Sequence, residues 1–154
     1  MKWQWADLGS PPGKLVTSPP QAVTYREGNT QRIYVFVSCE DNHLWICYWD
    51  GTKWEWTDQG SPPASWFDNT LRAITYRDND IQRIYAFFVG YDKHLWLHYW
   101  NGVKWQWADQ GTPGVEPNGH PSVITYKEGK TQRIYAFVAA PHVFGTKLFV
   151  NYWN

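Results

Sequence analysis

Residues 96–109 read WLHYWNGVKWQWAD, and this stretch decides the fold. Two short runs, in which aromatic residues alternate with other side chains, flank Asn101-Gly102, a dipeptide typical of a tight β-hairpin turn. Residues 45–58, WICYWDGTKWEWTD, repeat the pattern. The sequence therefore predicts an antiparallel hairpin at each of these places.

Outward from these hairpins, the whole chain is one motif written three times. The pattern W-x-W-x-D-x-G-[ST]-P recurs at Trp3, Trp54 and Trp105, an interval of 51 residues. Three further motifs recur with it: T-Y-[RK]-[DE] at Thr24, Thr75 and Thr125, Q-R-I-Y-x-F at Gln31, Gln82 and Gln132, and Y-W-[DN] at Tyr48, Tyr99 and Tyr152. Self-similarity at such a period indicates a repeat architecture.

Each repeat reads as four short strands without a helix. In the middle repeat, alternation and turn residues predict strand a at 72–76, strand b at 82–89, strand c at 94–100 and strand d at 104–109. Both faces of these strands carry apolar side chains, so a neighbour must cover each face of the sheet. The predicted fold class is all-β, a β-propeller of four-stranded blades with three blades per chain.

The order of the strands predicts how such a propeller would close. Strand d at 3–7 precedes the first a–c unit at 20–50, and the later units are 53–58 with 71–100 and 104–109 with 122–153, in one domain of residues 1–154. Two chains that exchange their N-terminal strands would form a homodimer with six blades, whereas three chains would form nine. An engineered or truncated fragment of a longer propeller is the alternative.

The composition excludes several classes of partner. The chain has 14 basic and 14 acidic residues and no run of like charge, so we expect no nucleic-acid binding. No apolar run approaches the roughly 20 residues of a membrane span, and the N-terminus is unlike a signal peptide. The sequence therefore predicts no membrane insertion and cytoplasmic synthesis, which leaves open a later release onto extracellular glycans.

The two cysteines are expected to be free. If Asp41-Asn42 form a two-residue turn, Cys39 lies opposite Leu44 and Cys47 lies opposite Phe36. Neither cysteine then faces the other, so the register argues against a disulfide.

The repeated motifs resemble those of the bacterial propeller lectins typified by the Photorhabdus luminescens lectin. The resemblance covers essentially the whole chain and rests on W-x-W-x-D-x-G-[ST]-P, Q-R-I-Y-A-F and Y-W-[DN]-G-x-x-W. Known members of that family resemble single-chain propellers of seven blades, whereas this chain has three units. The resemblance implies binding of fucose or related sugars in pockets between adjacent blades.

The strand directions place the b–c turns and the long d–a connections on the same rim, which is where we expect sugar to bind. The candidate carbohydrate-binding residues on this rim are His43, Trp45, Asp58, Ser61, His94, Trp96, Asp109 and Thr112. In the third unit Lys147 and Phe149 replace the His and Trp, behind a b–c turn at residues 141–146 that is expected to be two residues longer. The site of the third unit should therefore be altered.

Each of these signals has a purely structural alternative. The Trp-x-Trp pairs place both rings on one strand face, where packing between blades is favoured over a sugar platform. Asp58 and Asp109 suit the closing of a turn. The arginines of the Q-R-I-Y motif suit ion pairs with acids across the a–b hairpin: Arg32 with Glu27, Arg83 with Asp78 and Arg133 with Glu128.

The sequence gives no support for an enzyme. No nucleophile–base arrangement recurs, and no pair of carboxylates stands apart from the turn residues. His94 and His98 have no third metal ligand, so neither a metal nor a cofactor is expected. The leading hypothesis is a multivalent lectin for fucose-type or other neutral hexoses. A protein-binding propeller scaffold and a propeller hydrolase are the alternatives.

Overall fold

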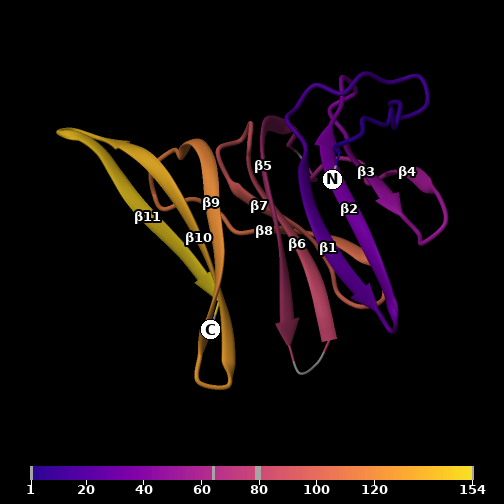
Figure 1. Ribbon diagram of the computed structural model, residues 1–154. Helices are drawn as coiled ribbons and strands as arrows, with labels where there is room; N and C mark the ends of the chain where they lie inside the picture. The colour runs from indigo at the N-terminus through magenta and orange to yellow at the C-terminus, as the bar shows by residue number, and fades with distance from the viewer. Residues whose placement is uncertain (1, 64, 79–80, 154) are drawn as a thin grey trace.

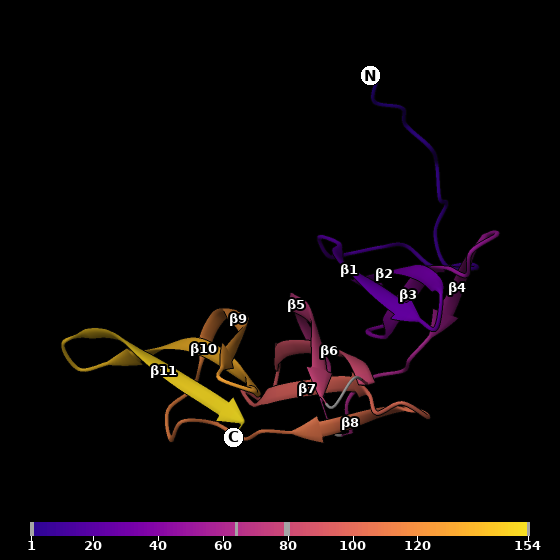
Figure 2. The same ribbon diagram turned by 60° about the horizontal axis from the view of Figure 1, so that its bottom comes forward.

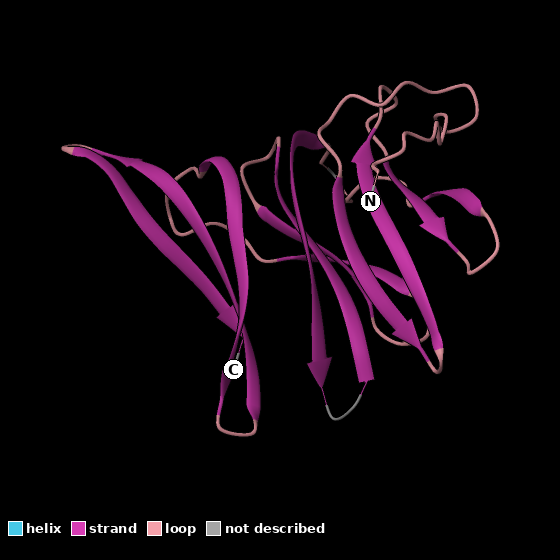
Figure 3. Ribbon diagram, in the orientation of Figure 1, coloured by secondary structure: helices cyan, strands magenta, loops and turns pink. Residues whose placement is uncertain are grey.

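The computed structural model describes residues 2–63, 65–78 and 81–153, and all regular structure in these residues is strand (Figure 3). Three antiparallel sheets follow one another along the chain (Figure 1). The first contains β1 (Gln21–Glu27), β2 (Thr30–Ser38), β3 (Leu44–Trp49) and β4 (Trp54–Asp58); the second contains β5 (Phe67–Asp78), β6 (Ile81–Gly90), β7 (Leu95–Trp100) and β8 (Trp105–Asp109); the third contains β9 (Asn118–Glu128), β10 (Thr131–His142) and β11 (Gly145–Trp153). This all-β propeller architecture is the fold class that the sequence predicts.

The hairpin between β7 and β8 is present, with a small shift at its turn. Trp100 pairs with Trp105, and the two loop residues are Gly102 and Val103 rather than Asn101 and Gly102. The Asn101 side chain accepts hydrogen bonds from the backbone of Val103 and Lys104 at 2.9 and 3.0 Å. Gly102 has φ 100°, a left-handed conformation that favours glycine. The turn motif thus fixes the register of the hairpin.

The predicted two-residue turns between strands b and c are wrong. Each turn has three residues, and its last residue, Asn42 or Lys93, takes a left-handed conformation with φ 61° or 67°. The extra residue shifts the register, so Cys47 lies opposite Val35 instead of Phe36. The Cys39 backbone N–H donates a hydrogen bond to the His43 carbonyl, so Cys39 lies opposite His43 instead of Leu44.

Both thiols are nevertheless free, as the sequence predicts, and the structure shows that both are buried. Burial raises the pKa of the Cys39 thiol to about 11, and burial also raises that of Cys47.

The turn of the third blade also differs from its prediction. Residues 141–146 were expected to form a longer loop, but Pro141 pairs with Thr146 and His142 pairs with Gly145. The β10–β11 ladder therefore continues to a turn of only two residues, Val143 and Phe144.

The predicted N-terminal strand at 3–7 is not a strand in the single chain. Figure 2 shows this segment extending away from the sheets, and the side chains of Trp3 and Trp5 are 100% and 102% exposed. A strand needs a hydrogen-bonded neighbour, and the described part of the chain offers none at this position. In the third sheet, β10 is the strand that pairs with β11.

The core lies between sheets rather than within them. One buried cluster joins the first and second sheets and includes Phe36, Leu44 and Phe88. Another joins the second and third sheets and includes Tyr76, Leu95 and Ile134. The second sheet is therefore covered on both faces by its neighbours, as the two apolar faces of its strands require.

Candidate functional site

The predicted rim brings a histidine and an aspartate together in each of the first two blades. The His43 Nδ1 lies 2.9 Å from an Asp58 carboxylate oxygen, and the His94 Nδ1 lies 2.8 Å from one of Asp109. All four side chains are about two-fifths exposed, from 39% to 41%. Each pair therefore offers an imidazole and a carboxylate to solvent beside the d–a connection.

The two aspartates also have the turn-closing role that the sequence suggested. Asp58 accepts a hydrogen bond from the Gly60 backbone, and Asp109 accepts one from Gly111, both at 2.7 Å. The backbone of Leu95 then donates to the Gly111 carbonyl at 2.8 Å, which ties the connection to β7. These bonds hold each His–Asp pair on rigid backbone.

The rim tryptophans do not provide a flat exposed surface. Trp96 is 6% exposed and belongs to the core between the first two blades. Its indole nitrogen donates to the Asp92 carboxylate at 3.0 Å, and Trp45, which is half-buried, donates to Asp41 at 3.3 Å. Both indoles therefore anchor the b–c turn, and the Trp96 ring is packed in the core.

Ser61 and Thr112 lie on the d–a connections that follow the two aspartates. Ser61 is half-buried, whereas Thr112 is exposed and accepts a hydrogen bond from the Gly114 backbone at 3.3 Å. Thr112, with Gly111 and Pro113, lines one side of a cavity of about 230 Å³ between the second and third blades.

An exposed aromatic pair on this rim was not among the predicted site residues. The rings of Trp66 and Tyr91 lie 5.5 Å apart with an interplanar angle of 37°, and the side chains are 51% and 62% exposed. The Tyr91 backbone donates to the Trp66 carbonyl at 2.9 Å, and the Lys93 ammonium lies 5.7 Å from the Tyr91 ring centre. We call Trp66, Tyr91, Asp92, Lys93, His94 and Asp109 the second-blade rim.

The first blade keeps the backbone of this arrangement but not its aromatic rings. Leu15 and Glu40 occupy the positions of Trp66 and Tyr91, and the Glu40 backbone donates to the Leu15 carbonyl at 3.0 Å. A comparison of the repeats in the sequence could have singled out Trp66 and Tyr91 as the substituted positions. Only the hydrogen bond shows that they are neighbours.

The opposite rim holds the Q-R-I-Y arginines, which serve the structure. Arg32 forms an ion pair with Glu27 at 2.6 Å and donates to the Asp50 carbonyl at 2.9 Å, which ties the a–b hairpin to the c–d turn. Arg133 pairs with Glu128 at 2.9 Å, whereas the Asp78 side chain lies outside the described residues. A cavity of about 330 Å³ lies beside Arg32, with Trp100 and Trp105 in its wall.

The described residues show no metal centre. Within 2–63, 65–78 and 81–153, no three His, Cys, Asp or Glu side chains gather as metal ligands. His98 is instead 2% exposed and packs against Trp105 and Trp107, with ring centres 5.0 and 4.0 Å apart. No helix in these ranges is long and apolar enough to cross a membrane.

Comparisons with known proteins find similar folds only among solved structures. No protein-family model matches the chain, and no curated protein does. Among solved structures, it is similar to a fucose-binding fungal lectin from Aleuria aurantia with a six-bladed β-propeller fold, at a TM-score of 0.66 and 17% identity. A mutant of that lectin in complex with alpha-methyl-L-fucoside gives the same values, and a mercury derivative gives a TM-score of 0.65.

The match covers 90% of this chain and 46% of the lectin chain, so this chain spans about half the length of that propeller. At 17% identity the likeness shows the fold alone. The likeness supports the propeller reading of the three sheets.

Proposed function

We propose that the protein is a non-enzymatic lectin that binds fucose-type or other neutral hexoses. Two independent features support this proposal: the propeller fold that it shares with a fucose-binding lectin, and the solvent-exposed aromatic pair Trp66–Tyr91 on a rigid rim. The equal numbers of acidic and basic residues suit an uncharged ligand. The exposed aromatic pair carries the proposal, because packing between blades gives no reason for it.

The second-blade rim has the chemistry that a hexose needs. Aromatic rings bind the apolar C–H face of a pyranose, and neighbouring polar groups fix its hydroxyls. Beside Trp66 and Tyr91, the His94–Asp109 pair offers both a donor and an acceptor, and Lys93 offers a donor. The sugar would lie against the aromatic rings with its hydroxyls toward this polar edge.

The three blades should bind unequally. In the first blade the pair His43–Asp58 is kept, but Leu15 occupies the position of Trp66, and in the third blade Lys147 and Phe149 replace the His and Trp. We therefore expect the second blade to hold the strongest site. Several such sites in one six-bladed homodimer would raise the avidity for a glycan-coated surface by about 100-fold or more.

Calorimetric titration with fucose, and with galactose and mannose for comparison, tests the proposal. Trp66→Ala and Tyr91→Ala should each weaken the preferred sugar by roughly 10-fold or more, since each removes a stacking surface. Both side chains are more than half exposed, so the urea midpoint should stay unchanged.

Leu15→Ala is the matched control, because it truncates an exposed side chain at the position equivalent to Trp66 without removing a ring. If both aromatic variants bind sugar like the wild type, the second-blade rim is not the site. If the wild type binds none of these sugars, and none on a glycan array, the lectin proposal fails.

A further inference from the structure

The third blade leaves exposed an apolar face that the other blades bury. Leu148 is 72% exposed, whereas Leu95 at the same position of the second blade is 3% exposed and Leu44 of the first is 0%. Tyr126 is 55% exposed, whereas its counterpart Tyr76 is 4% exposed. The side chains are identical, so the missing element is a neighbouring blade.

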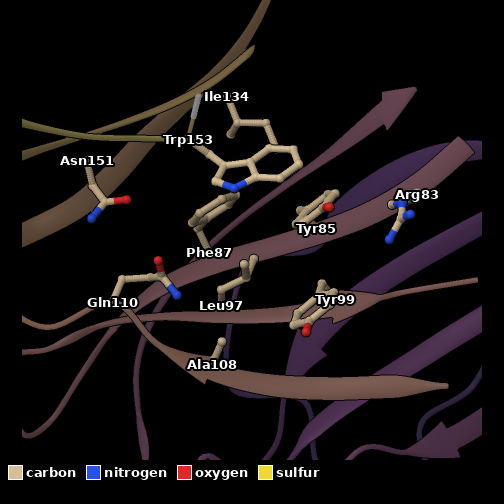
Figure 4. Close-up of a pocket in the computed structure, with 10 residues that line it drawn as sticks. All are labelled: Arg83, Tyr85, Phe87, Leu97, Tyr99, Ala108, Gln110, Ile134, Asn151 and Trp153. Atoms are coloured by element: carbon tan, nitrogen blue, oxygen red, sulfur yellow. The ribbon is translucent and has the colours of Figure 1, made fainter. Parts of the chain in front are cut away.

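One cavity lies where the complete blades hold a tryptophan. In the second blade, Trp105 contacts four rings, those of Tyr34, Phe36, His98 and Trp100. The residues at the four equivalent positions one blade further on are Tyr85, Phe87, Asn151 and Trp153, and all four line a cavity of about 490 Å³ (Figure 4). The residue equivalent to Trp105 in the next d strand is Trp3.

The cavity beside Thr112 matches a second tryptophan in the same way. Trp107 contacts Phe88 and His98, with ring centres 5.7 and 4.0 Å apart, and donates to the Gln59 carbonyl at 3.3 Å. The equivalent residues one blade on are Val138, Asn151 and Gln110, and they line the cavity of about 230 Å³. Trp5 is the residue equivalent to Trp107.

The N-terminal segment is already placed as the outer strand of a blade that precedes the first. The Trp56 indole donates to the Leu8 carbonyl at 3.2 Å, just as Trp107 donates to the Gln59 carbonyl at 3.3 Å. Asp7 accepts a hydrogen bond from the Gly9 backbone at 2.8 Å, as Asp58 and Asp109 do from their glycines. The segment therefore keeps the turn and the lateral contact of a d strand while its own sheet is absent.

We propose that a second copy of the chain supplies the sheet to which the N-terminal segment belongs. The Trp3 and Trp5 side chains of the second copy would fill the two cavities. Residues 3–7 of each copy would pair with β11 at the edge of the other copy's third sheet and complete its third blade. Because the exchange is mutual, the two chains would form a closed ring. This inference deepens the six-bladed assembly of the proposed function and does not depend on sugar binding.

The register of the exchanged strand follows from the complete blades. Trp100 pairs with Trp105 and Trp96 with Asp109, so Trp153 pairs with Trp3 of the second copy and Phe149 with its Asp7. Tyr152 then faces Gln4, as Tyr99 faces Gln106, where the phenol donates to the amide oxygen at 3.1 Å.

The exchange also completes the third rim site with a residue from each copy. Lys147 stands at the position of His43 and His94, and the strand of the second copy brings Asp7 to the position of Asp58 and Asp109. A lysine and an aspartate thus replace the His–Asp pair. The opposite charges favour this pairing between copies, and the contribution of an exposed ion pair is small.

The mass in solution tests the assembly. Light scattering should give about twice the chain mass of 18.1 kDa. The double variant Trp3→Ala/Trp5→Ala should raise the dimer dissociation constant by roughly 100-fold or more, because both cavities would stay unfilled. Lys2→Ala is the control, since it changes an exposed residue of the same segment and should leave the mass unchanged.

A cysteine cross-link tests the register while Trp3 and Trp5 stay in place. Under oxidation, Gln4→Cys/Tyr152→Cys should give covalent dimers, because the two positions face each other across the exchanged strand. Gln4→Cys/Thr146→Cys, six residues along β11, should give none. Cys39 and Cys47 are buried and do not compete.

A wild-type mass of one chain at all concentrations, or a mass of three chains, would overturn the two-copy ring. Equal cross-linking of both cysteine pairs would overturn the register. Sugar titration measures neither the mass in solution nor the cross-linking, so the lectin proposal and this inference can fail separately.

Discussion

The second and third blades contain nearly the same strands, yet they differ in how much of each side chain is buried. Leu95 and Leu148 are 3% and 72% exposed, and Tyr76 and Tyr126 are 4% and 55% exposed. The second blade packs between two sheets, whereas the third packs against one. Burial in this architecture is therefore a property of the adjacent blade, and a local sequence acquires its core only when that neighbour is present.

The largest expected effect comes from truncating the same leucine in the two blades. Leu95→Ala should destabilise the protein by about 2–5 kcal/mol, because it leaves a cavity in a closed core. Leu148→Ala should cost within about 0.5 kcal/mol in dilute monomer, where the side chain is exposed. Urea unfolding of both variants, at low and high protein concentration, measures the difference.

The proposed ring predicts that the cost of Leu148→Ala rises with protein concentration, since a second copy would bury this side chain. A cost that stays small at all concentrations would mean that the third face remains uncovered. A small cost for Leu95→Ala would contradict the closed core between the second and third blades.

A smaller effect concerns His98, at the position where the third blade has Asn151. Burial lowers the pKa of His98 from 6.5 to about 3, so the folded chain keeps the ring neutral while the unfolded chain takes up a proton below about pH 6.5. The wild type therefore loses stability as the pH falls from about 6.5 toward 3, by up to about 1.4 kcal/mol per pH unit. The variant His98→Asn lacks this dependence.

Urea unfolding of the wild type and His98→Asn at several pH values between about 7 and 4 tests this. Their stability difference should move in favour of the variant as the pH falls, while groups common to both proteins cancel. A difference that is constant over this range would show that His98 is not held neutral by burial.

The smallest effect concerns the reactivity of the two thiols of the first blade, and no change in the free energy of unfolding is expected. Cys39 and Cys47 are buried and their pKa values are raised, so a thiol reagent near pH 8 should react slowly with the folded protein. Unfolded protein should yield both thiols without a reductant. Titration with a chromogenic disulfide reagent measures both rates, and thiols that appear only after reduction would contradict the free pair.

The repeats, the strands and the c–d hairpins could be predicted because local chemistry decides them. Asn101 and Gly102 specify a turn by hydrogen bonding and by a left-handed backbone, and alternation specifies the faces. The b–c turns were mispredicted because each contains a third residue, Asn42 or Lys93, in a left-handed conformation. Asparagine is enriched in this conformation among non-glycine residues, whereas lysine adopts it infrequently. The single extra residue moved Cys47 from Phe36 to Val35.

The candidate site could be predicted only in part. The pairs His43–Asp58 and His94–Asp109 join two motifs on adjacent strands of one hairpin, so the expected rim brings them together. Trp96 looked equally suitable in the sequence but is 6% exposed, whereas Trp66 and Tyr91 form the exposed pair. Their contact crosses from a d–a connection to a b–c turn, and no local pattern encodes such a contact.

The sequence by itself determined the propeller repeat, the turn-closing aspartates and the aromatic pairs of each d strand, because these depend on residues close along the chain. Only the tertiary structure decided which of those aromatics are in the core and which are exposed. Trp105 and Trp3 occupy the same place in the motif, yet one is packed against another blade and the other is 100% exposed. The physical reason is that burial of apolar area depends on what lies across the gap between two sheets, and that is a property of assembled blades.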